Sequence, residues 1–289
     1  MKALAIDVGG TKIYNTIVND AGEIIASVEK HDTPKTTEAI VAVFKSIIAK
    51  HESEIDVVAF ATAGAVNNEN TKIISSTANL PKGYSTLDFQ ALSKKPVFLE
   101  NDANSAAWAE HIIGVSKGMA HSVLLTLGTG VGGGIIVDNK LLKGKSGAAG
   151  EMHFKIYNDS RRKCTCGAWD CFEAYASGTG LKLTAEEMSG NLNITTYDVI
   201  KNLADPQMAE IFNKWQNDLL AGLVGLANIF DPDALILSGS MAEFIDTDYL
   251  EKEVNAQIVT TPTRVLKAKA GNYAGMIGVA LLAMEAQHG

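Results

Sequence analysis

The stretch "AIDVGGTKIYNTIVND", residues 5 to 20, decides the fold. An apolar run carries one carboxylate, Asp7, near its end, and a turn of Gly-Gly-Thr-Lys leads into a second run rich in β-branched residues. Because "NDAG" at 19 to 22 signals another turn, residues 2 to 28 are predicted to form a three-stranded meander. Glycines and a hydroxyl between strands let successive backbone N–H groups converge on an anion. The turn at 9 to 12 is therefore a candidate phosphate site.

The same plan recurs in "HSVLLTLGTGVGGGIIVDNKLL", residues 121 to 142. A shift of 119 residues places Gly10 on Thr129, and Asp138-Asn139 follows as a hairpin turn. Two unrelated hairpins remain an alternative on the pattern alone, but both turns have the chemistry that suits a phosphate. Facing each other across a cleft, they would hold a nucleotide polyphosphate, with the carboxylate of the first strand positioned for Mg²⁺, directly or through water.

Between the two copies lies "PVFLENDANSAAWAEHIIG", which predicts a strand over 97 to 100 and then a helix. Asn101 and Asp102 stand at the junction of the two. One interpretation is that they only cap the helix. The other is that a carboxylate at this junction faces the phosphate cleft, where a general base would accept a proton from an attacking hydroxyl.

The remaining chain adds helices and a further strand. Residues 206 to 230 carry apolar side chains at helical spacing, and "ALILSGS" at 234 to 240 reads as a buried strand that meets a glycine turn at Gly239, with a helix beginning near Met241. The helix predicted over 274 to 286 is small and apolar and should pack between other elements. Strands interleaved with helices and a duplicated unit predict an α/β fold of two similar lobes.

Composition excludes several classes of protein. Hydrophobic residues make up 46% and charged residues 20%, the formal net charge is −8, and no basic cluster exceeds "SRRK" at 160 to 163, so no nucleic-acid partner is expected. Asp7 interrupts the first apolar run before a signal-peptide core could form. The longest apolar stretch, 274 to 284, is too short to span a membrane. We expect a cytoplasmic protein without a membrane partner.

Six segments together resemble the ROK family of bacterial sugar kinases and sugar-responsive repressors, within the actin and hexokinase superfamily. They are "DVGGTK" (7–12), "ENDAN" (100–104), "LGTGVGGG" (127–134), "GAAGE" (147–151), "CTCGAWDCFEAYASG" (164–178) and "AGMIGVALLA" (274–283). The resemblance implies a two-lobed actin-like ATPase fold, ribonuclease H-like, with a cleft between the lobes. We expect a smaller N-terminal lobe, 1–115 plus 274–289, and a larger lobe, 116–273, that carries the cysteine loop.

The resemblance also implies a set of functional residues. Asp102 would be the base that takes a proton from a sugar hydroxyl. ATP would be held at Asp7, Gly9, Gly10, Thr11, Lys12, Thr129, Gly130 and Gly239. The sugar would contact Gly64, Asn79, Asn101, Asp102, Glu151, His153 and Glu173, which is sensible because carboxylates and amides bind adjacent hydroxyls.

Cys164, Cys166 and Cys171 fall within eight residues, which in a reducing compartment argues for a metal or for chance, not for a disulfide scaffold. The family's run of this kind supplies three thiolates to a structural Zn²⁺, with a histidine ten residues before the first cysteine as fourth ligand. Here Phe154 stands at that position, and His153 lies eleven residues before. Either the loop absorbs the slip and His153 completes the site, or another group does, or zinc is absent. We favour the slip.

The resemblance implies an ATP-dependent kinase with Mg²⁺ that phosphorylates the 6-hydroxyl of glucose or of an N-acetylhexosamine such as N-acetylmannosamine. A fructokinase and a non-catalytic sugar-binding or regulatory protein remain alternatives. A repressor would need a DNA-binding module before the phosphate turn, and Asp7 arrives too early to leave room for one. Because family members are commonly dimers or tetramers, we expect a homodimer. The motifs do not decide which hexose is the substrate.

Overall fold

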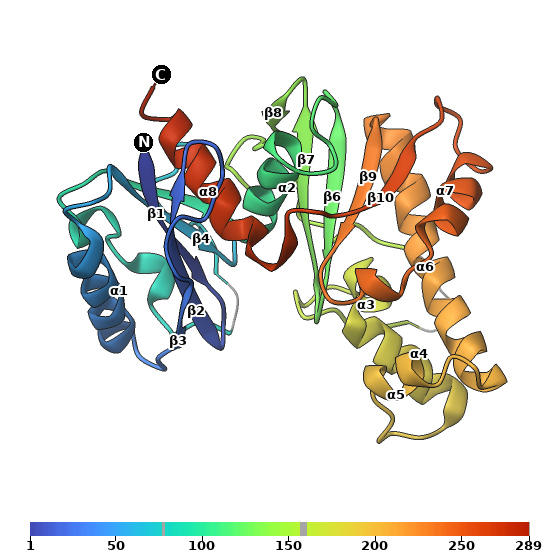
Figure 1. Ribbon diagram of the computed structural model, residues 1–289. Helices are drawn as coiled ribbons and strands as arrows, with labels where there is room; N and C mark the ends of the chain where they lie inside the picture. The colour runs from blue at the N-terminus through green and yellow to red at the C-terminus, as the bar shows by residue number, and fades with distance from the viewer. Residues whose placement is uncertain (77–78, 157–160, 289) are drawn as a thin grey trace.

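Two five-stranded sheets with the same strand order form the frame of the molecule (Figure 1). The computed structural model describes residues 1–76, 79–156 and 161–288. The first sheet has the order β3-β2-β1-β4-β5. Its strands are β1 (Lys2–Val8), β2 (Lys12–Asn19), β3 (Glu29–Asp32), β4 (Val57–Thr62) and β5 (Val97–Asn101).

The second sheet repeats the strand order and strand directions of the first. Its order is β10-β9-β6-β7-β8, and its strands are β6 (Ser122–Leu127), β7 (Val131–Val137), β8 (Lys140–Leu141), β9 (Ala234–Ser238) and β10 (Arg264–Lys267). In each sheet the first three strands form an antiparallel meander, and the other two add in parallel to the first strand. The predicted duplication and the α/β class are confirmed.

Two helices lie between the sheets, and each covers the sheet of the other half (Figure 1). Helix α2 (Asp102–Ile112) follows β5 of the first sheet and packs on β6 and β7, whereas α8 (Ala274–Glu285) follows β10 and packs on β1 and β4. The two helices also pack on each other. One apolar cluster, with Ala5, Ala107, Ile236 and Ala280 among its buried members, runs through this layer. The last helix thus packs between other elements, as predicted.

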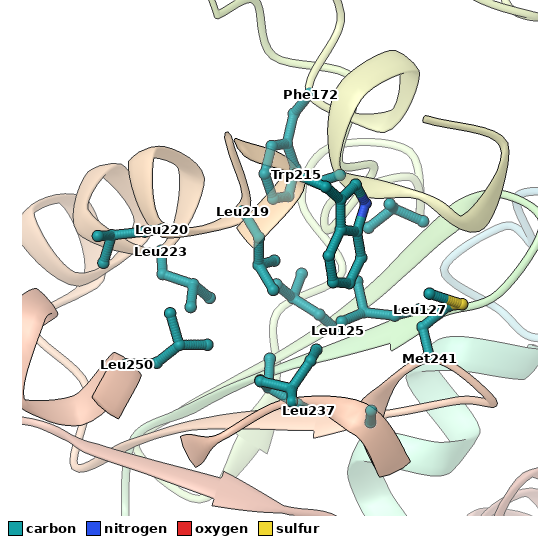
Figure 2. Close-up of a cluster of buried hydrophobic side chains, with 14 of the residues drawn as sticks. Leu125, Leu127, Phe172, Trp215, Leu219, Leu220, Leu223, Leu237, Met241 and Leu250 are labelled. Atoms are coloured by element: carbon teal, nitrogen blue, oxygen red, sulfur yellow. The ribbon is translucent and has the colours of Figure 1, made fainter. Parts of the chain in front are cut away.

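The outer faces of both sheets are covered by long helices. Helix α1 (Thr37–His51) packs on the first sheet, where Ile40 and Phe44 meet Leu4. Helix α6 (Pro206–Phe230) packs on the second, and Figure 2 shows its Trp215, Leu219 and Leu223 facing strand side chains such as Leu125 and Leu237. The remaining α-helices are α3 (Glu173–Ala176), α4 (Gly178–Ser189), α5 (Thr196–Lys201) and α7 (Thr247–Asn255).

Helix α6 begins and ends where the sequence indicates. Asp205 caps it by accepting the N–H groups of Gln207 and Met208, and Pro206 occupies its first turn. Asp231, with φ of 44°, ends it before a proline. Among the described residues no helix is both long and apolar enough to cross a membrane.

Two local predictions are wrong. The third strand of the first meander begins at Glu29, beyond the predicted limit of 28, because residues 24–26 follow β2 only through irregular contacts such as Ile25 N–H to Ile17 O. The helix expected near Met241 is a single 3₁₀ turn, Ala242–Phe244, and the next α-helix begins at Thr247. The limits of the two lobes stay a prediction.

Candidate active site

Two carboxylates stand at the carboxyl edge of the parallel strands of the first sheet. Asp7 is in register with Ala61 of β4, and Asn101 ends β5 in register with Thr62, so that Asp102 begins α2 at the same edge. Carboxyl ends of adjacent parallel strands are where α/β sheets bind ligands. The structure thus brings Asp7 and Asp102 together, although 95 residues separate them in the chain.

The environment makes both carboxylates weaker acids than usual. Burial, followed by the charge of Asp102, raises the pKa of Asp7 to about 7. The side chain of Asp102 is open to solvent, but protein atoms crowd around it, and this desolvation raises the pKa of Asp102 to about 6. Hydrogen bonds from the N–H groups of Ala103 and of Asp102 itself oppose the shift, and the charge of Glu151 adds to it. Asp102 is still mostly ionised at pH 7.

Asn101 is the N-cap of α2, and capping uses its oxygen but not its whole amide group. Its Oδ1 accepts the N–H groups of Ala103 and Asn104, each at 2.9 Å. Its Nδ2 donates to the carbonyl oxygen of Gly64 at 3.0 Å. An amide nitrogen carries two hydrogens, so one N–H of Asn101 remains for a ligand. Gly64 and Asn101, both predicted to contact sugar, therefore lie side by side.

The first glycine turn closes tightly and has Asn79 beside it. Gly9 N–H donates to the carbonyl oxygen of Lys12 at 3.0 Å. A Cβ added to Gly10 would lie 2.7 Å from Cβ of Asn79, so only glycine allows this approach. The ammonium of Lys12 pairs with Asp32 of β3. Asn79 follows residues 77 and 78, which lie outside the described part of the chain.

The second glycine turn is held by residues distant in the chain. Gly128 accepts a hydrogen bond from Gly178 N–H at 2.8 Å, and the carbonyl oxygen of Thr129 accepts one from Thr179 Oγ1 at 2.7 Å. Met241 N–H donates to the carbonyl oxygen of Leu127 at 3.1 Å, which folds the turn at Gly239 onto the end of β6. The predicted nucleotide residues of the second half thus gather at one edge of its sheet.

Glu173 joins this turn to the cysteine loop. Its Oε2 accepts Val131 N–H at 3.1 Å, and its Oε1 accepts Thr165 Oγ1 at 2.7 Å and Cys164 Sγ at 3.4 Å. A Cβ on Gly130 would lie 2.5 Å from Oε2. The sequence predicts that Glu173 contacts sugar. In the structure both oxygens of its carboxylate accept hydrogen bonds from protein groups. No sequence signal indicated this link.

Four side chains in and before the cysteine loop form a candidate zinc site. The ligand atoms of His153, Cys164, Cys166 and Cys171 all lie within 4.8 Å of one another. Cys166 Sγ is 3.5 Å from Cys171 Sγ, and His153 Nδ1 is 3.7 Å from Cys164 Sγ. Bonds to tetrahedral Zn²⁺ of about 2.3 Å from sulfur and about 2.0 Å from nitrogen separate ligands by roughly 3.5–3.8 Å. The donor set and spacing fit zinc.

The loop adopts the one-residue slip that we favoured. Phe154 stacks on Phe172 with 4.9 Å between ring centroids, inside the core of the second half. That contact turns His153 to the cysteines. His153 Nε2 also lies 3.5 Å from Glu151 Oε2, so the cysteine loop reaches another predicted sugar residue.

A pocket opens between the two halves beside Asn101. Asn101 and Asn104 line it from the first half, and Gly132, Gly133 and the loop 147–151 line it from the second. Glu151, at the end of this loop, is half exposed. The pocket walls are mostly glycine and alanine, so the polar groups that face it are few and specific.

A buried ion pair next to this pocket was not predicted from the sequence. Glu100 of β5 is 1% exposed and pairs with Lys143 at 2.8 Å. A charged residue within the apolar strand "VFLEN" was the available signal, since a buried carboxylate needs a partner. Its partner could not be deduced, because Lys143 belongs to the other half.

Comparisons with known proteins agree with this geometry. The ROK family model matches residues 3–286. Over 98% of its length the chain is 34% identical to a glucokinase of Streptomyces coelicolor, 97% of which is covered. It is 29% identical to an N-acetylmannosamine kinase of Yersinia pseudotuberculosis, over 98% of each chain.

Solved structures extend these similarities. A ROK family glucokinase from Streptomyces griseus, in complex with glucose and AMPPNP, matches 99% of this chain with all of its own, at 30% identity and a TM-score of 0.82. A ROK hexokinase from Thermus thermophilus matches all of this chain with all of its own, at 28% identity and a TM-score of 0.85.

Proposed function

The chain belongs to the ROK family, and on that premise we propose that it is an ATP-dependent sugar kinase. It transfers the γ-phosphoryl group to the 6-hydroxyl of glucose or of an N-acetylhexosamine such as N-acetylmannosamine. The glucokinase and N-acetylmannosamine kinase relatives support this substrate class. The observation that carries the proposal is the carboxylate of Asp102 at the edge of the first sheet, beside Asp7 and the pocket between the halves.

Asp102 acts as the general base. As the 6-oxygen forms its bond to the γ-phosphorus, the bond from that phosphorus to the bridging oxygen breaks, ADP leaves, and the hydroxyl proton passes to the carboxylate. A pKa of about 6 suits this task, because the carboxylate is ionised at pH 7 and still close enough in basicity to accept the proton.

The sugar would bind at the pocket between the halves, which must open further to admit it, since its cavity of about 30 Å³ holds little more than water. Asn101 offers its one remaining N–H to a sugar oxygen, and Glu151 offers a carboxylate that accepts from hydroxyls. Gly64 and Asn79 lie next to Asn101 and the first turn respectively. Since phosphoryl transfer asks mainly for positioning, these contacts would matter as much as the base.

The nucleotide lies between the two glycine turns. Backbone N–H groups of Gly10 to Lys12 and of Thr129 and Gly130 would bind phosphate oxygens, while Gly9 N–H closes the first turn. Asp7 would hold Mg²⁺ directly or through water, and the ion would neutralise phosphate charge. A second hollow, lined by Phe212 and Gln216 of α6 and by Phe244 and Tyr249 beyond the turn at Gly239, would suit the flat base.

A bound zinc would have a structural role. His153 and the three cysteines would hold it, and the ion would stiffen the loop that Glu173 joins to the second turn. His153 would also orient Glu151 toward the sugar. No proton or phosphoryl transfer depends on this site.

The deciding experiment is ADP release from Mg-ATP with glucose, mannose, N-acetylmannosamine, N-acetylglucosamine and fructose. One sugar should give fast turnover, and Asp102→Asn should lower it by about 10²–10⁴-fold while sugar affinity is retained. Asp138→Asn is the matched control. Asp138 is exposed in a hairpin turn, and asparagine tolerates the positive φ that the backbone has there.

Other outcomes would redirect the proposal. Full turnover by Asp102→Asn would remove this residue from the chemistry. Fructose as the preferred sugar would establish the fructokinase alternative. Sugar binding without turnover across the panel would favour a non-catalytic sugar-binding protein.

A further inference from the structure

One buried ion pair joins the two halves directly behind the proposed sugar site. Lys143 follows β8 in the second half, and Glu100 lies in β5 of the first, immediately before Asn101. Lys143 is 18% exposed and Glu100 is 1% exposed. Such a pair is shielded from solvent, so its geometry matters far more than that of a surface pair.

The two oxygens of Glu100 have different partners. Oε1 accepts the backbone N–H of Asn101 at 2.9 Å and Nδ2 of Asn104 at 3.1 Å. Oε2 accepts Nζ of Lys143 at 2.8 Å and Nδ2 of Asn70 at 2.9 Å. One oxygen therefore faces the start of α2, where the pocket begins, and the other faces the second half.

Asn104 depends on this arrangement. Its side chain is 2% exposed, it lines the pocket, and its Oδ1 has no hydrogen-bond partner among the described residues. The bond from its Nδ2 to Glu100 is what holds the amide in this orientation. A buried acceptor without a partner is costly unless a ligand or water supplies the donor.

Lys143 also begins the loop that closes the pocket. Its Nζ donates to the carbonyl oxygen of Asn67 at 3.2 Å. Asn68 Nδ2 donates to the carbonyl oxygens of Gly144 and Lys145, at 3.2 and 3.1 Å. The loop then runs to Glu151. One lysine thus ties the Glu151 loop to the strand that carries Asn101.

We propose that Lys143 is a positioning residue for sugar binding, which acts through Glu100 on Asn101 and Asn104 and touches neither sugar nor ATP. The inference rests on the proposed function, because it assigns the sugar to this pocket. Without Lys143 the Glu100 carboxylate would be buried with no cation, and it would turn toward water or draw water in. Its hydrogen bonds to Asn101 and Asn104 would then loosen.

The test compares Lys143→Met with Lys143→Arg. Lys143→Met should raise the sugar KM, and the sugar Kd measured by calorimetry without ATP, by about tenfold, equivalent to about 1.4 kcal/mol. The KM for ATP should stay within about twofold, and Lys143→Arg should recover most of the sugar affinity because it restores the cation. Lys182→Met is the control, since Lys182 pairs with Glu186 on the surface of α4.

Two results would overturn the proposal. One is a Lys143→Met variant with reduced thermal stability and an unchanged sugar Kd, which would make the pair merely structural. The other is an equal rise of the KM for sugar and the KM for ATP, which would mean that the change disturbs the whole site and not the sugar pocket alone.

A double variant covers the case in which Lys143→Met does not fold. Glu100→Gln with Lys143→Met removes both charges, so it should fold and bind sugar better than Lys143→Met alone. Independent, additive effects of the two changes would contradict coupling through the pair.

Wild-type behaviour separates the two proposals. Sugar binding without turnover would end the kinase proposal and leave the Kd comparison to decide the role of Lys143. A wild-type chain that binds none of the sugars would end both.

Discussion

The two halves of the molecule share one strand order and carry different chemistry. At the shift of 119 residues Asp7 corresponds to Thr126, so the carboxylate at the end of β1 has a hydroxyl as its counterpart in β6. The first half supplies carboxylates at its strand ends, and the second supplies a glycine turn and the cysteine loop. The hydrogen-bonded strands thus determine the fold of both halves, whereas single side chains at the strand ends determine the chemistry of each half.

The helices between the sheets repeat this contrast. Helix α2 begins at Asp102, whereas α8, its counterpart in the second half, begins with Ala274 and Gly275. A Cβ on Gly275 would lie 3.8 Å from Oδ2 of Asp7. The helix of the second half therefore brings a glycine beside the carboxylate of Asp7, where the first half has a carboxylate of its own.

The strongest way to break the comparison is to remove the polar group at each of the two corresponding positions, Asp7 and Thr126, in turn. Asp7→Asn should lower kcat with Mg-ATP by about 10²-fold or more, because phosphoryl transfer depends on charges placed around the phosphates. Thr126→Val removes the counterpart hydroxyl and should change kcat by less than about threefold. Steady-state rates at saturating sugar decide between them. Equal losses would mean that both halves contribute side-chain chemistry.

The pH profile tests whether the carboxylate of the first half acts as a base. The pKa of Asp102, about 6, means that acid protonates it and removes the base. Since kcat/KM reports the free enzyme, in which Asp7 must also be ionised to hold Mg²⁺, it should begin to fall below about pH 7 and fall more steeply, toward a hundredfold per pH unit, below about pH 6. An acidic limb near pH 4, where an unperturbed aspartate titrates, would contradict the role of desolvation.

Zinc sharpens the comparison, because among the described residues only the second half has a cluster of histidine and cysteine ligands. Purified protein should contain about one zinc per chain, and both His153→Ala and Cys166→Ser should lower zinc affinity by at least about tenfold. Phe154→Leu changes the residue after His153, whose side chain packs on Phe172 and not on the cysteines, so this variant should keep the metal. Full zinc in His153→Ala would establish three cysteines and another group as the ligands.

The frame was predictable from local patterns, and the links across it were not. The two strand-turn-strand units are predicted by β-branched runs and turn residues, and helix α6 is predicted by the helical spacing of its apolar residues. Glu100 and Lys143, in contrast, are 43 residues apart and lie in different halves. The choice between His153 and Phe154 depends on a ring contact with Phe172, eighteen residues further along the chain. Such contacts exist only once tertiary packing has formed.

The smallest expected effect comes from glycines of the second turn. Gly130→Ala would place a methyl 2.5 Å from Glu173, so it should lower the melting temperature by about 2–4 °C, equivalent to about 1 kcal/mol. Gly128 has no atom within 4 Å of an added Cβ, so Gly128→Ala should leave the melting temperature of the ligand-free protein unchanged.

Gly128→Ala then isolates the effect on the nucleotide. If phosphate oxygens approach the backbone here, the added methyl should raise the KM for ATP by about threefold while the sugar KM is constant. Gly225→Ala, an equally open glycine within α6, is the control for the substitution itself. An unchanged KM for ATP in Gly128→Ala would mean that the second turn does not receive phosphates at this residue, and the likeness of the two turns would then concern the fold alone.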